Sequence, residues 1–241
     1  MKKALVLFGS ESDKYIYSEL IENLKESFEV DFEIISAHRK PARLSERLKQ
    51  DDFDFLVAGA GLAAHLPGVC ASLTKKPVFG IPVEACFGGL DALLSIMQMP
   101  KDIPVGTIHA SDSKRMAGLI STLSDQTSKV VHLVVDSDIQ NYEYCTKEVN
   151  RFKDMALELG VEIAVSNSIV AETLNIVLFH KEEAFEIVDN ALYIPLFEKS
   201  DSQSPMSALK VLDWFSNGGV WFGVNNSRNA LIFLKKFIGE K

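Results

Sequence analysis

Residues 58–67, which read AGAGLAAHLP, constrain the fold of this chain more than any other stretch. An apolar run that ends at Val57 breaks into small residues, followed by one imidazole, that of His65. Gly59 and Gly61 can adopt positive φ and have no Cβ, so the backbone can approach a ligand closely. The proline that closes the stretch suits the first turn of a helix. We therefore expect a strand, a glycine turn and a helix N-terminus, where N–H groups can hold a small anionic or polar ligand.

The same letters also fit the dinucleotide-binding pattern G-x-G-x-x-A, which would end at Ala64. An acidic residue, Glu84, stands at about the right distance downstream. That pattern belongs after the first strand of a βαβ unit, whereas here it follows the third predicted strand, and Pro67 interrupts the long helix that it requires. Dinucleotide binding is therefore the weaker interpretation.

The composition is that of an ordinary soluble globular protein. The chain has 241 residues, 47% of them hydrophobic, which is enough for one large domain or two modest ones. No apolar run approaches the ~18 residues of a transmembrane helix, and the start of the chain turns polar too soon for a signal peptide. We expect a cytoplasmic protein that binds no membrane. The net charge of −8, with no cluster of Lys and Arg, argues against nucleic acid as a partner.

Three cysteines occur, Cys70, Cys86 and Cys145, and none has CxxC spacing. This pattern argues against a disulfide framework and against a zinc site. We interpret each cysteine as a small buried residue and expect no metal.

The first half of the chain alternates short apolar runs with helical patterns, which is typical of an α/β fold with a parallel sheet. A helical pattern with apolar residues on one side follows the first run, and residues 88–98 form another. The predicted strands cover residues 4–8, 30–35, 53–58, 78–82 and 104–108.

Polar residues gather just after the first two predicted strands. Ser10, Ser12 and Asp13 are residues that commonly cap helices, and capping alone would explain any one of them. Two hydroxyls and a carboxylate on one turn also suit a phosphoribosyl group. His38 and Arg39 follow the second strand, and the carboxyl ends of parallel strands face a common ligand crevice. An imidazole there can transfer protons near neutral pH, and the guanidinium can make two bonds to one phosphate.

The motifs GSESD, SAHRKP, AGAGLAAHLPG, PVFGIPV and LLSIMQMP followed by PVGT resemble, in order and spacing, those of the PurE family of purine biosynthesis. They cover about residues 3–110, and five linked motifs are far more specific than one. The forms SAHR and AAHLPG resemble class I, the N5-carboxyaminoimidazole ribonucleotide mutases. The resemblance implies a flavodoxin-like parallel sheet and neither a metal nor an organic cofactor. It also implies an isomerase that moves the carboxylate of a bound ribonucleotide from the exocyclic nitrogen to ring carbon C4.

The resemblance assigns a role to each matching residue. His38, in SAHR, corresponds to the family's proton carrier. The ribose phosphate would be held by Ser10, Ser12, Asp13, Ser36 and Arg39. The pocket for the base and the carboxylate would be lined by Gly61, Ala64, His65 and Leu66.

Three departures from the family pattern bear on the lid of the pocket and on subunit contacts. Lys14 stands where an aromatic residue usually follows GSxSD, the glycine after QMP is missing, and Arg115 replaces an asparagine. Two alternatives to the mutase stay open, a direct carboxylase that uses carbon dioxide in the same pocket and a non-catalytic nucleotide sensor. Retention of His38 and Arg39 speaks against the sensor, because binding alone would not need the imidazole.

Past Gln126 the order of elements starts again. KVVHLVVDSD resembles KALVLFGSESD and NALYIPLF resembles PVFGIPV, with strand-like runs near residues 131, 161, 175, 192 and 220. We predict two tandem flavodoxin-like three-layer α/β/α domains with parallel sheets, an active one at 1–126 and a degenerate repeat at 127–241. The second has Ser166-Asn167-Ser168 in place of SAHR, so we expect no catalysis there. We interpret His132, within a strand, and His180, at the start of a helix, as structural.

The resemblance also implies self-association, because members of this family are typically octamers with active sites where subunits meet. The second domain stands in place of the family's terminal extension. Our hypothesis is a homotetramer, whose four chains carry eight domains and four active sites. The partner molecule that we expect is a small ribonucleotide.

Overall fold

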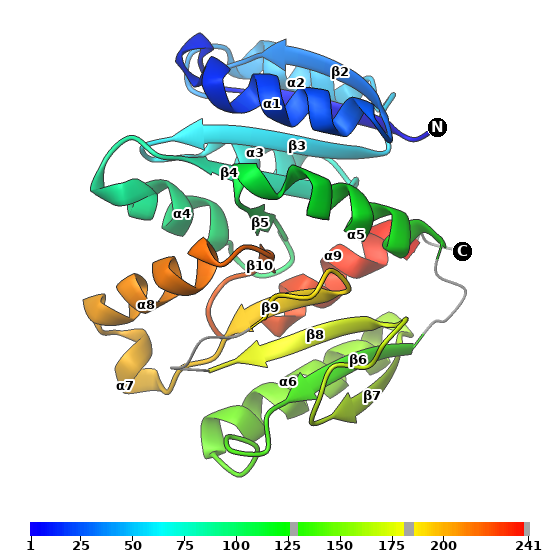
Figure 1. Ribbon diagram of the computed structural model, residues 1–241, viewed down its shortest axis with the longest axis vertical. Helices are drawn as coiled ribbons and strands as arrows, with labels where there is room; N and C mark the ends of the chain where they lie inside the picture. The colour runs from blue at the N-terminus through cyan, green and yellow to red at the C-terminus, as the bar shows by residue number, and fades with distance from the viewer. Residues whose placement is uncertain (126–129, 181–185, 239–241) are drawn as a thin grey trace.

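The computed structural model describes residues 1–125, 130–180 and 186–238, and it arranges the chain around one ten-stranded sheet (Figure 1). The strand order is β2-β1-β3-β4-β5-β10-β9-β8-β6-β7. The first five strands come from the first half of the chain and the other five from the second half. The predicted α/β class is confirmed. The predicted boundary after Gln126 lies outside the described residues and stays a prediction.

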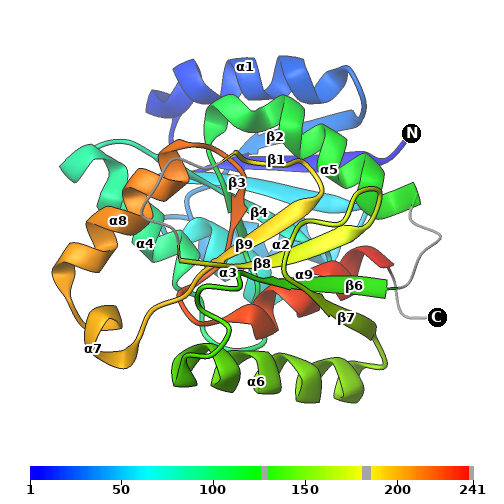
Figure 2. The ribbon, with the colours of Figure 1, turned by 60° about the horizontal axis from the view of Figure 1, so that its bottom comes forward.

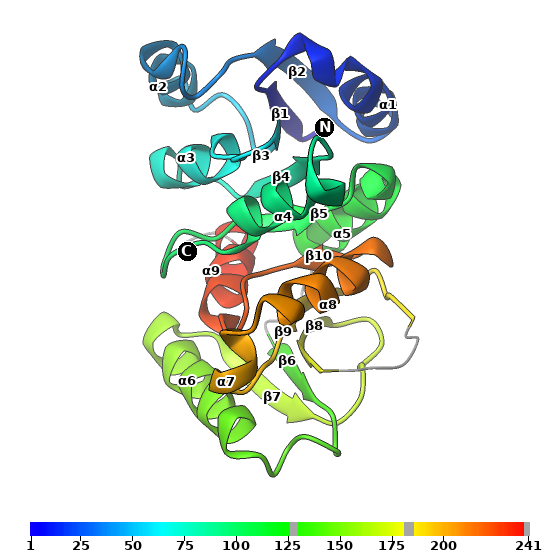
Figure 3. The same ribbon diagram turned by 90° about the vertical axis from the view of Figure 1, so that its left-hand side faces the viewer.

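The first half is a parallel five-stranded sheet with helices on both faces. Helices α1 and α5 lie side by side on one face, and α2 and α3 lie on the other (Figures 2 and 3). The elements are β1 (Lys3–Phe8), α1 (Lys14–Lys25), β2 (Glu29–Ile34), α2 (Pro41–Lys49), β3 (Phe55–Gly61), α3 (Leu66–Leu73), β4 (Val78–Val83), α4 (Leu90–Met97), β5 (Gly106–Ile108) and α5 (Ser113–Asp125). Three 3-10 turns accompany them, η1 (Glu11–Asp13), η2 (Phe87–Gly89) and η3 (Ala110–Asp112).

All five strands predicted for this half exist, but the glycine stretch differs from expectation. Strand β3 continues to Gly61, where it pairs with Val83 of β4, instead of ending at residue 58. Neither glycine adopts positive φ, and the turn falls at Leu62, whose φ is 55°. Gly59 makes room for a core side chain, because a Cβ there would lie 2.1 Å from Cε1 of Phe8. The small residues therefore serve packing within the sheet as well as the cleft.

The second half repeats the strand order of the first. Its five strands, in the order β7-β6-β8-β9-β10, are parallel and occupy the positions of β2-β1-β3-β4-β5. The strands near residues 131, 161, 175, 192 and 220 are therefore present as predicted. The elements are β6 (Val130–Val135), α6 (Glu143–Leu159), β7 (Glu162–Ser166), β8 (Leu174–Phe179), β9 (Ala191–Pro195), α7 (Lys199–Ser202), α8 (Pro205–Ser216), β10 (Val220–Trp221) and α9 (Ser227–Ile238).

On one face of the sheet, the second half lacks a helix that the first half has. Helix α2 connects β2 to β3, but the corresponding connection, from β7 to β8, is a loop over residues 167–173. Helix α8 still covers this face while α6 and α9 cover the other, so the second half lacks a counterpart of α2 and keeps helices on both faces. A connection of seven residues is too short to cross the sheet with a packed helix in between.

The two halves join edge to edge through β5 and β10, the one antiparallel pair among the described strands. Thr107 faces Trp221 and Ile108 faces Val220 across this joint. Helix α4 packs on α8 and α5 packs on α9, so corresponding elements meet in pairs (Figure 1). The arrangement has approximate two-fold character, since an antiparallel edge pairing brings like surfaces together.

The joint explains two departures from the family pattern. Arg115, on α5, donates through Nη1 to the carbonyl of Ile187 at 3.1 Å and forms an ion pair with Asp189 at 3.1 Å. The loop that lacks the glycine, residues 99–103, is bound by Asn229 of α9, whose Nδ2 donates to the carbonyl of Pro100 at 2.9 Å. Both positions therefore contact the second half of the same chain.

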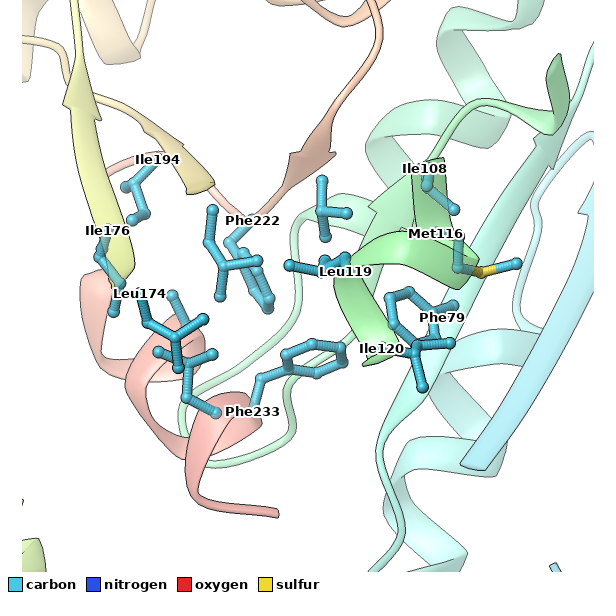
Figure 4. Close-up of a cluster of buried hydrophobic side chains, with 14 of the residues drawn as sticks. Phe79, Ile108, Met116, Leu119, Ile120, Leu174, Ile176, Ile194, Phe222 and Phe233 are labelled. Atoms are coloured by element: carbon cyan, nitrogen blue, oxygen red, sulfur yellow. The ribbon is translucent and has the colours of Figure 1, made fainter. Parts of the chain in front are cut away.

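One apolar core crosses the joint. Phe79 of β4 meets Phe233 of α9 edge to face, with ring centroids 5.2 Å apart. Phe233 in turn lies 5.2 Å from Phe222, which follows β10. Figure 4 shows this cluster, which extends from Met116 of α5 to Ile176 of β8. Because both halves bury apolar surface in one cluster, we expect them to depend on each other for stability.

Candidate active site

An open cleft of about 740 Å³ lies at the carboxyl ends of β1, β2, β3 and β4. This is where ligands bind in open parallel sheets. Within the described parts of the chain, every residue that lines it belongs to the first half, between positions 9 and 85. Nine of the ten site residues predicted from the sequence line the cleft: Ser10, Ser12, Asp13, Ser36, His38, Arg39, Gly61, His65 and Leu66.

Two imidazoles contact each other in this cleft. Nε2 of His38 lies 2.8 Å from Nδ1 of His65, and the rings are nearly perpendicular, at 83°. His38 follows β2, whereas His65 is the N-cap of α3, with Pro67 in the first turn as predicted. In a hydrogen bond between two neutral imidazoles one nitrogen donates and the other accepts. The pair can therefore hold one mobile proton at the edge of the cleft.

The turn after β1 presents hydroxyls and a carboxylate. The hydroxyl of Ser10 accepts a bond from the backbone N–H of Ser12 at 3.2 Å, so Ser10 does cap the turn. The hydroxyl of Ser12 lies 2.8 Å from that of Ser10 and 2.9 Å from Oδ1 of Asp13. Asp13 is buried apart from 8% of its surface. Capping and ligand binding are compatible here, because each hydroxyl keeps a lone pair.

The loop after β2 is tied to the loop after β1. Nη2 of Arg39 donates to the carbonyl of Gly9 at 3.2 Å. The backbone N–H of Arg39 donates to the hydroxyl of Ser36 at 3.3 Å. The guanidinium has further N–H groups beyond this bond, and a fork of this kind suits a phosphate. Arg39 thus places a positive charge next to the hydroxyls of Ser10 and Ser12.

Ala64 is the predicted site residue that the structure places elsewhere. Its side chain is 1% exposed and packs in the core with Leu66 and Cys70 instead of lining the cleft. The reason is local, because Leu62 and Ala63 form the turn after β3 and line the cleft, and the next side chain then faces inward.

Several lining residues were missed by sequence reasoning. Tyr15 lines the cleft with 66% of its surface exposed, one position after the lysine that replaces the family's aromatic residue. The position of Tyr15 next to Lys14 is the sequence signal that could have indicated it. Glu84 and Ala85, at the end of β4, also line the cleft, and only their place after a predicted strand could have indicated them.

No residue described in the second half lines this cleft, and the loop that corresponds to SAHR carries no imidazole. Ser166 donates its hydroxyl to the carbonyl of Ser168 at 2.9 Å. Nδ1 of His180 lies 2.7 Å from the carbonyl of Leu196, as expected for a structural histidine, although the helix predicted after it falls outside the described residues. Nδ1 of His132 is buried in β6, and no described residue forms a hydrogen bond with it.

The cysteines partly follow expectation. Cys70 and Cys145 are buried, and burial raises the pKa of each thiol, so both are unreactive. Cys86 is exposed, and the prediction that it is buried is wrong, because it lies in the loop after β4. Over the described ranges, no three His, Cys, Asp or Glu side chains come together as a metal site. Nor do those ranges contain a helix long and apolar enough to cross a membrane.

The fold and the cleft define an α/β protein with a polar ligand site at the carboxyl ends of parallel strands, built around a pair of histidines. Residues 3–131 match the family described as AIR carboxylase, and the chain belongs to this family. The match covers the first half, including every residue that lines the cleft.

Individual relatives agree with this assignment. The N5-carboxyaminoimidazole ribonucleotide mutase of Methanocaldococcus jannaschii is 53% identical over 105 residues, which are 43% of this chain and 66% of the relative. That of Pyrococcus abyssi is 46% identical over 123 residues, or 48% of this chain and 70% of the relative. The phosphoribosylaminoimidazole carboxylase of Candida glabrata is 38% identical over 148 residues, 59% of this chain and 24% of the relative. The aligned region thus spans about two thirds of the length of the two mutases.

Proposed function

We propose that this chain is an N5-carboxyaminoimidazole ribonucleotide mutase of purine biosynthesis. The observation that carries the proposal is the contact between His38 and His65 in a cleft lined by the family's motifs. The names of the relatives from M. jannaschii and P. abyssi support the same activity.

The reaction needs a proton carrier that works in both directions. Loss of the carbamate breaks the bond between the exocyclic nitrogen and carbon, releases carbon dioxide and needs a proton on that nitrogen, which His38 delivers. Ring carbon C4 then bonds to the carbon dioxide, and the proton that C4 loses returns to His38. The net change is an isomerisation with no proton consumed. An imidazole suits both steps because its ordinary pKa lies near neutrality.

The remaining predicted residues bind and orient the substrate. Ser10, Ser12 and Ser36 supply hydroxyls and Arg39 supplies charge for the phosphate, while the carboxylate of Asp13 accepts from ribose hydroxyls. The base lies against Gly61, His65 and Leu66. Ala64 supports this wall from the core and makes no contact with the substrate.

The freed carbon dioxide must stay beside C4 until the second step. A Cβ at position 61 would lie 3.2 Å from the carbonyl of Val83, so Gly61 allows β3 and β4 to close the floor of the cleft tightly. Ala60 and Ala63 add small apolar walls. Such walls favour a small apolar intermediate over water and keep the reacting atoms together.

The deciding experiment is an isomerisation assay with N5-carboxyaminoimidazole ribonucleotide, using the intact chain and His38→Asn. We expect conversion by the natural chain and a loss of about 100-fold or more in the variant, the usual contribution of a proton-transfer group. Binding of the ribonucleotide without conversion would favour the nucleotide sensor.

A second arm of the same experiment tests the direct carboxylase, which the name of the C. glabrata relative favours. The uncarboxylated 5-aminoimidazole ribonucleotide is supplied with bicarbonate. If product forms faster in this arm than from N5-carboxyaminoimidazole ribonucleotide, the chain is a direct carboxylase and the proposed mutase activity is wrong.

We also propose that residues 127–241 are a degenerate repeat of residues 1–126, and that the chain is a cytoplasmic homotetramer. The common strand order and the paired contacts of α4 with α8 and of α5 with α9 support the repeat. In the tetramer each second half occupies the place of a neighbouring subunit. Light scattering coupled to size-exclusion chromatography tests the homotetramer, and a monomer at micromolar concentration would contradict this proposal.

A further inference from the structure

Residues 99–103, the loop between α4 and β5, are held by the start of helix α9 in the second half. The side chain of Asn229 donates through Nδ2 to the carbonyl of Pro100 at 2.9 Å, and its Oδ1 accepts the N–H of Asp102 at 3.0 Å. Nε of Arg228 donates to the carboxylate of Asp102 at 2.5 Å. Asn229 is buried, with 2% of its surface exposed. A buried amide that is bonded at both its donor and its acceptor fixes the backbone that it binds.

The start of α9 is in turn fixed within the second half. Glu148 of α6 is buried, and its Oε1 accepts both the N–H of Ser227, at 2.9 Å, and the hydroxyl of Ser227, at 2.5 Å. A carboxylate at the N-terminus of a helix is also favoured by the helix dipole. These residues of α6 and α9 lie past residue 131, where the match to the family ends. The position of the 99–103 loop therefore depends on a part of the chain outside the family match.

Met99 connects this loop to helix α3. Its thioether packs on the backbone of Gly68, where an added Cβ would lie 3.1 Å from both Sδ and Cε of Met99. Met99 and Ile103 also pack against the buried cluster that contains Leu66 and Cys70 of α3. Because Gly68 lies in the first turn of α3, Met99 supports that turn directly.

Helix α9 also contacts the other end of α3. Nζ of Lys236 donates at 3.5 Å to the carbonyls of Thr74, the C-cap of α3, and of Lys76. A lysine at the C-terminus of a helix is favoured by the helix dipole. Helix α3 is therefore supported by α9 at both ends, through Met99 at its start and through Lys236 at its end.

The first turn of α3 is the part of the helix that faces the active cleft. His65 is its N-cap and Leu66 its first residue, and both line the cleft. The carbonyl of His65 accepts the N–H of Val69 at 2.9 Å, so the backbone of His65 moves with the helix. Nδ1 of His65 lies 2.8 Å from Nε2 of His38. A hydrogen bond weakens steeply once its atoms lose this distance and alignment, so the pair depends on where the turn lies.

We propose that the second half of the chain positions the histidine pair of the cleft. Asn229 holds the 99–103 loop, and Met99 of that loop supports the first turn of α3. That turn places His65 against His38. Asn229 and Met99 are positioning residues, since neither lines the cleft. The consequence for catalysis rests on the proposed function, whereas the placement of the two imidazoles does not.

The first test shortens the side chain that supports α3. Met99→Ala leaves a gap beside Gly68, so the first turn of α3 can move, and a displacement of about 1 Å can slow a reaction up to about 100-fold. We expect kcat to fall roughly 2- to 30-fold. The KM should change less, because the residues proposed to bind the phosphate follow β1 and β2 instead of α3. Met99→Leu, which keeps most of the volume, should restore most of kcat.

The background of His65→Gln shows whether Met99 acts through His65. There the fall in kcat caused by Met99→Ala should be less than about twofold, because the imidazole that Met99 positions is already gone. Equal falls in both backgrounds, or an unchanged kcat in Met99→Ala itself, would contradict the inference.

The second test removes the support that comes from the second half. Asn229→Ala deletes the two bonds to the 99–103 loop. Asn225→Gly is the matched control, because Asn225 also makes two bonds to backbone, with the N–H and the carbonyl of Phe197 at 2.9 Å each, but within the second half. Glycine tolerates the φ of 53° at this position. We expect kcat to fall roughly 2- to 30-fold in Asn229→Ala alone, and equal kcat in the two variants would contradict the inference.

Nuclear magnetic resonance of the imidazole rings tests the placement without catalysis. The chain has five histidines, and the ring signals of His38 and His65 can be assigned with His38→Asn and His65→Gln. Both signals should move in Met99→Ala and in Asn229→Ala. The signal of His132, in β6, should stay in place and show that the fold is intact.

Asn225→Gly is again the control. It should move the signal of His180, whose ring centroid lies 6.3 Å from that of Phe197, and leave the signals of the histidine pair unchanged. Unmoved signals of the pair in Met99→Ala and Asn229→Ala would overturn the inference, whether or not the chain converts the ribonucleotide. Moved signals in a protein whose natural chain converts no ribonucleotide would overturn the proposed function and support the positioning of the pair.

Discussion

The two histidines of the cleft contact each other, although each is positioned by a different loop. His65 is held by the start of α3, and its Nδ1 contacts Nε2 of His38. Replacing His65 by Gln removes this contact and leaves the proton carrier in place. We expect kcat to fall about 10- to 100-fold, less than in His38→Asn. His109→Gln, outside the cleft, is the control. An unchanged kcat would show that the imidazoles act separately.

Asp52 is the residue at which stability depends most clearly on pH. Hydrogen bonds from Lys3 and Arg47 lower the pKa of its carboxyl to about 2, from an ordinary 3.8. The folded state then binds fewer protons than the unfolded state between about pH 2 and 4, so this stabilisation is complete above that window and lost below it.

Asp52→Asn should therefore be less stable than the natural chain at pH 7. We expect about 1 kcal/mol or less, because Asp52 is substantially exposed and water weakens such pairs. The difference should disappear near pH 2. Urea unfolding at pH 7 and pH 3 measures it, and a larger difference at pH 3 would contradict the assignment.

At the scale of elements, the turn between α8 and β10 depends on two glycines. Gly218 has a φ of +91°, and a Cβ there would lie 2.3 Å from Oδ2 of Asp112. That carboxylate accepts the N–H of Gly219 at 2.8 Å, which ties the turn to the first half. The turn thus determines how β10 meets β5.

Gly218→Ala should destabilise the protein by about 1–3 kcal/mol, through left-handed strain and displacement of Asp112. Gly118→Ala is the matched control, because Gly118 lies within α5 with nothing within 4 Å of the added Cβ. It should stabilise by about 0.5–1 kcal/mol. Urea midpoints compare the two, and a neutral Gly218→Ala would show that the turn adapts.

The element scale also shows how far the sequence pattern reaches. Each of the ten strands overlaps a segment in which the sequence pattern predicts a strand. The end of β3 differs from the prediction, because pairing with β4 extends the strand as far as Gly61. The pattern also could not show that Ala64 turns inward, since one residue in the preceding turn decides the direction of every later side chain.

For the whole molecule, the shared core predicts a single unfolding transition. Phe79 from the first half and Phe233 from the second pack together, and β5 pairs with β10. Tryptophan emission reports the second half alone, because both tryptophans lie there, whereas far-ultraviolet circular dichroism reports both halves. The two urea curves should coincide. An earlier loss of emission would show that the second half unfolds independently.

By itself, the sequence determined the strands, the α/β class and nine of the ten residues predicted for the cleft, because these follow from local patterns of apolar and polar residues and from linked motifs. Only the tertiary structure decided the contact between His38 and His65 and the single sheet that joins the halves. The physical reason is that these features depend on distances between residues far apart in the chain. A local pattern fixes which residues form a strand and which face is apolar, but it does not fix which edge of a sheet meets another.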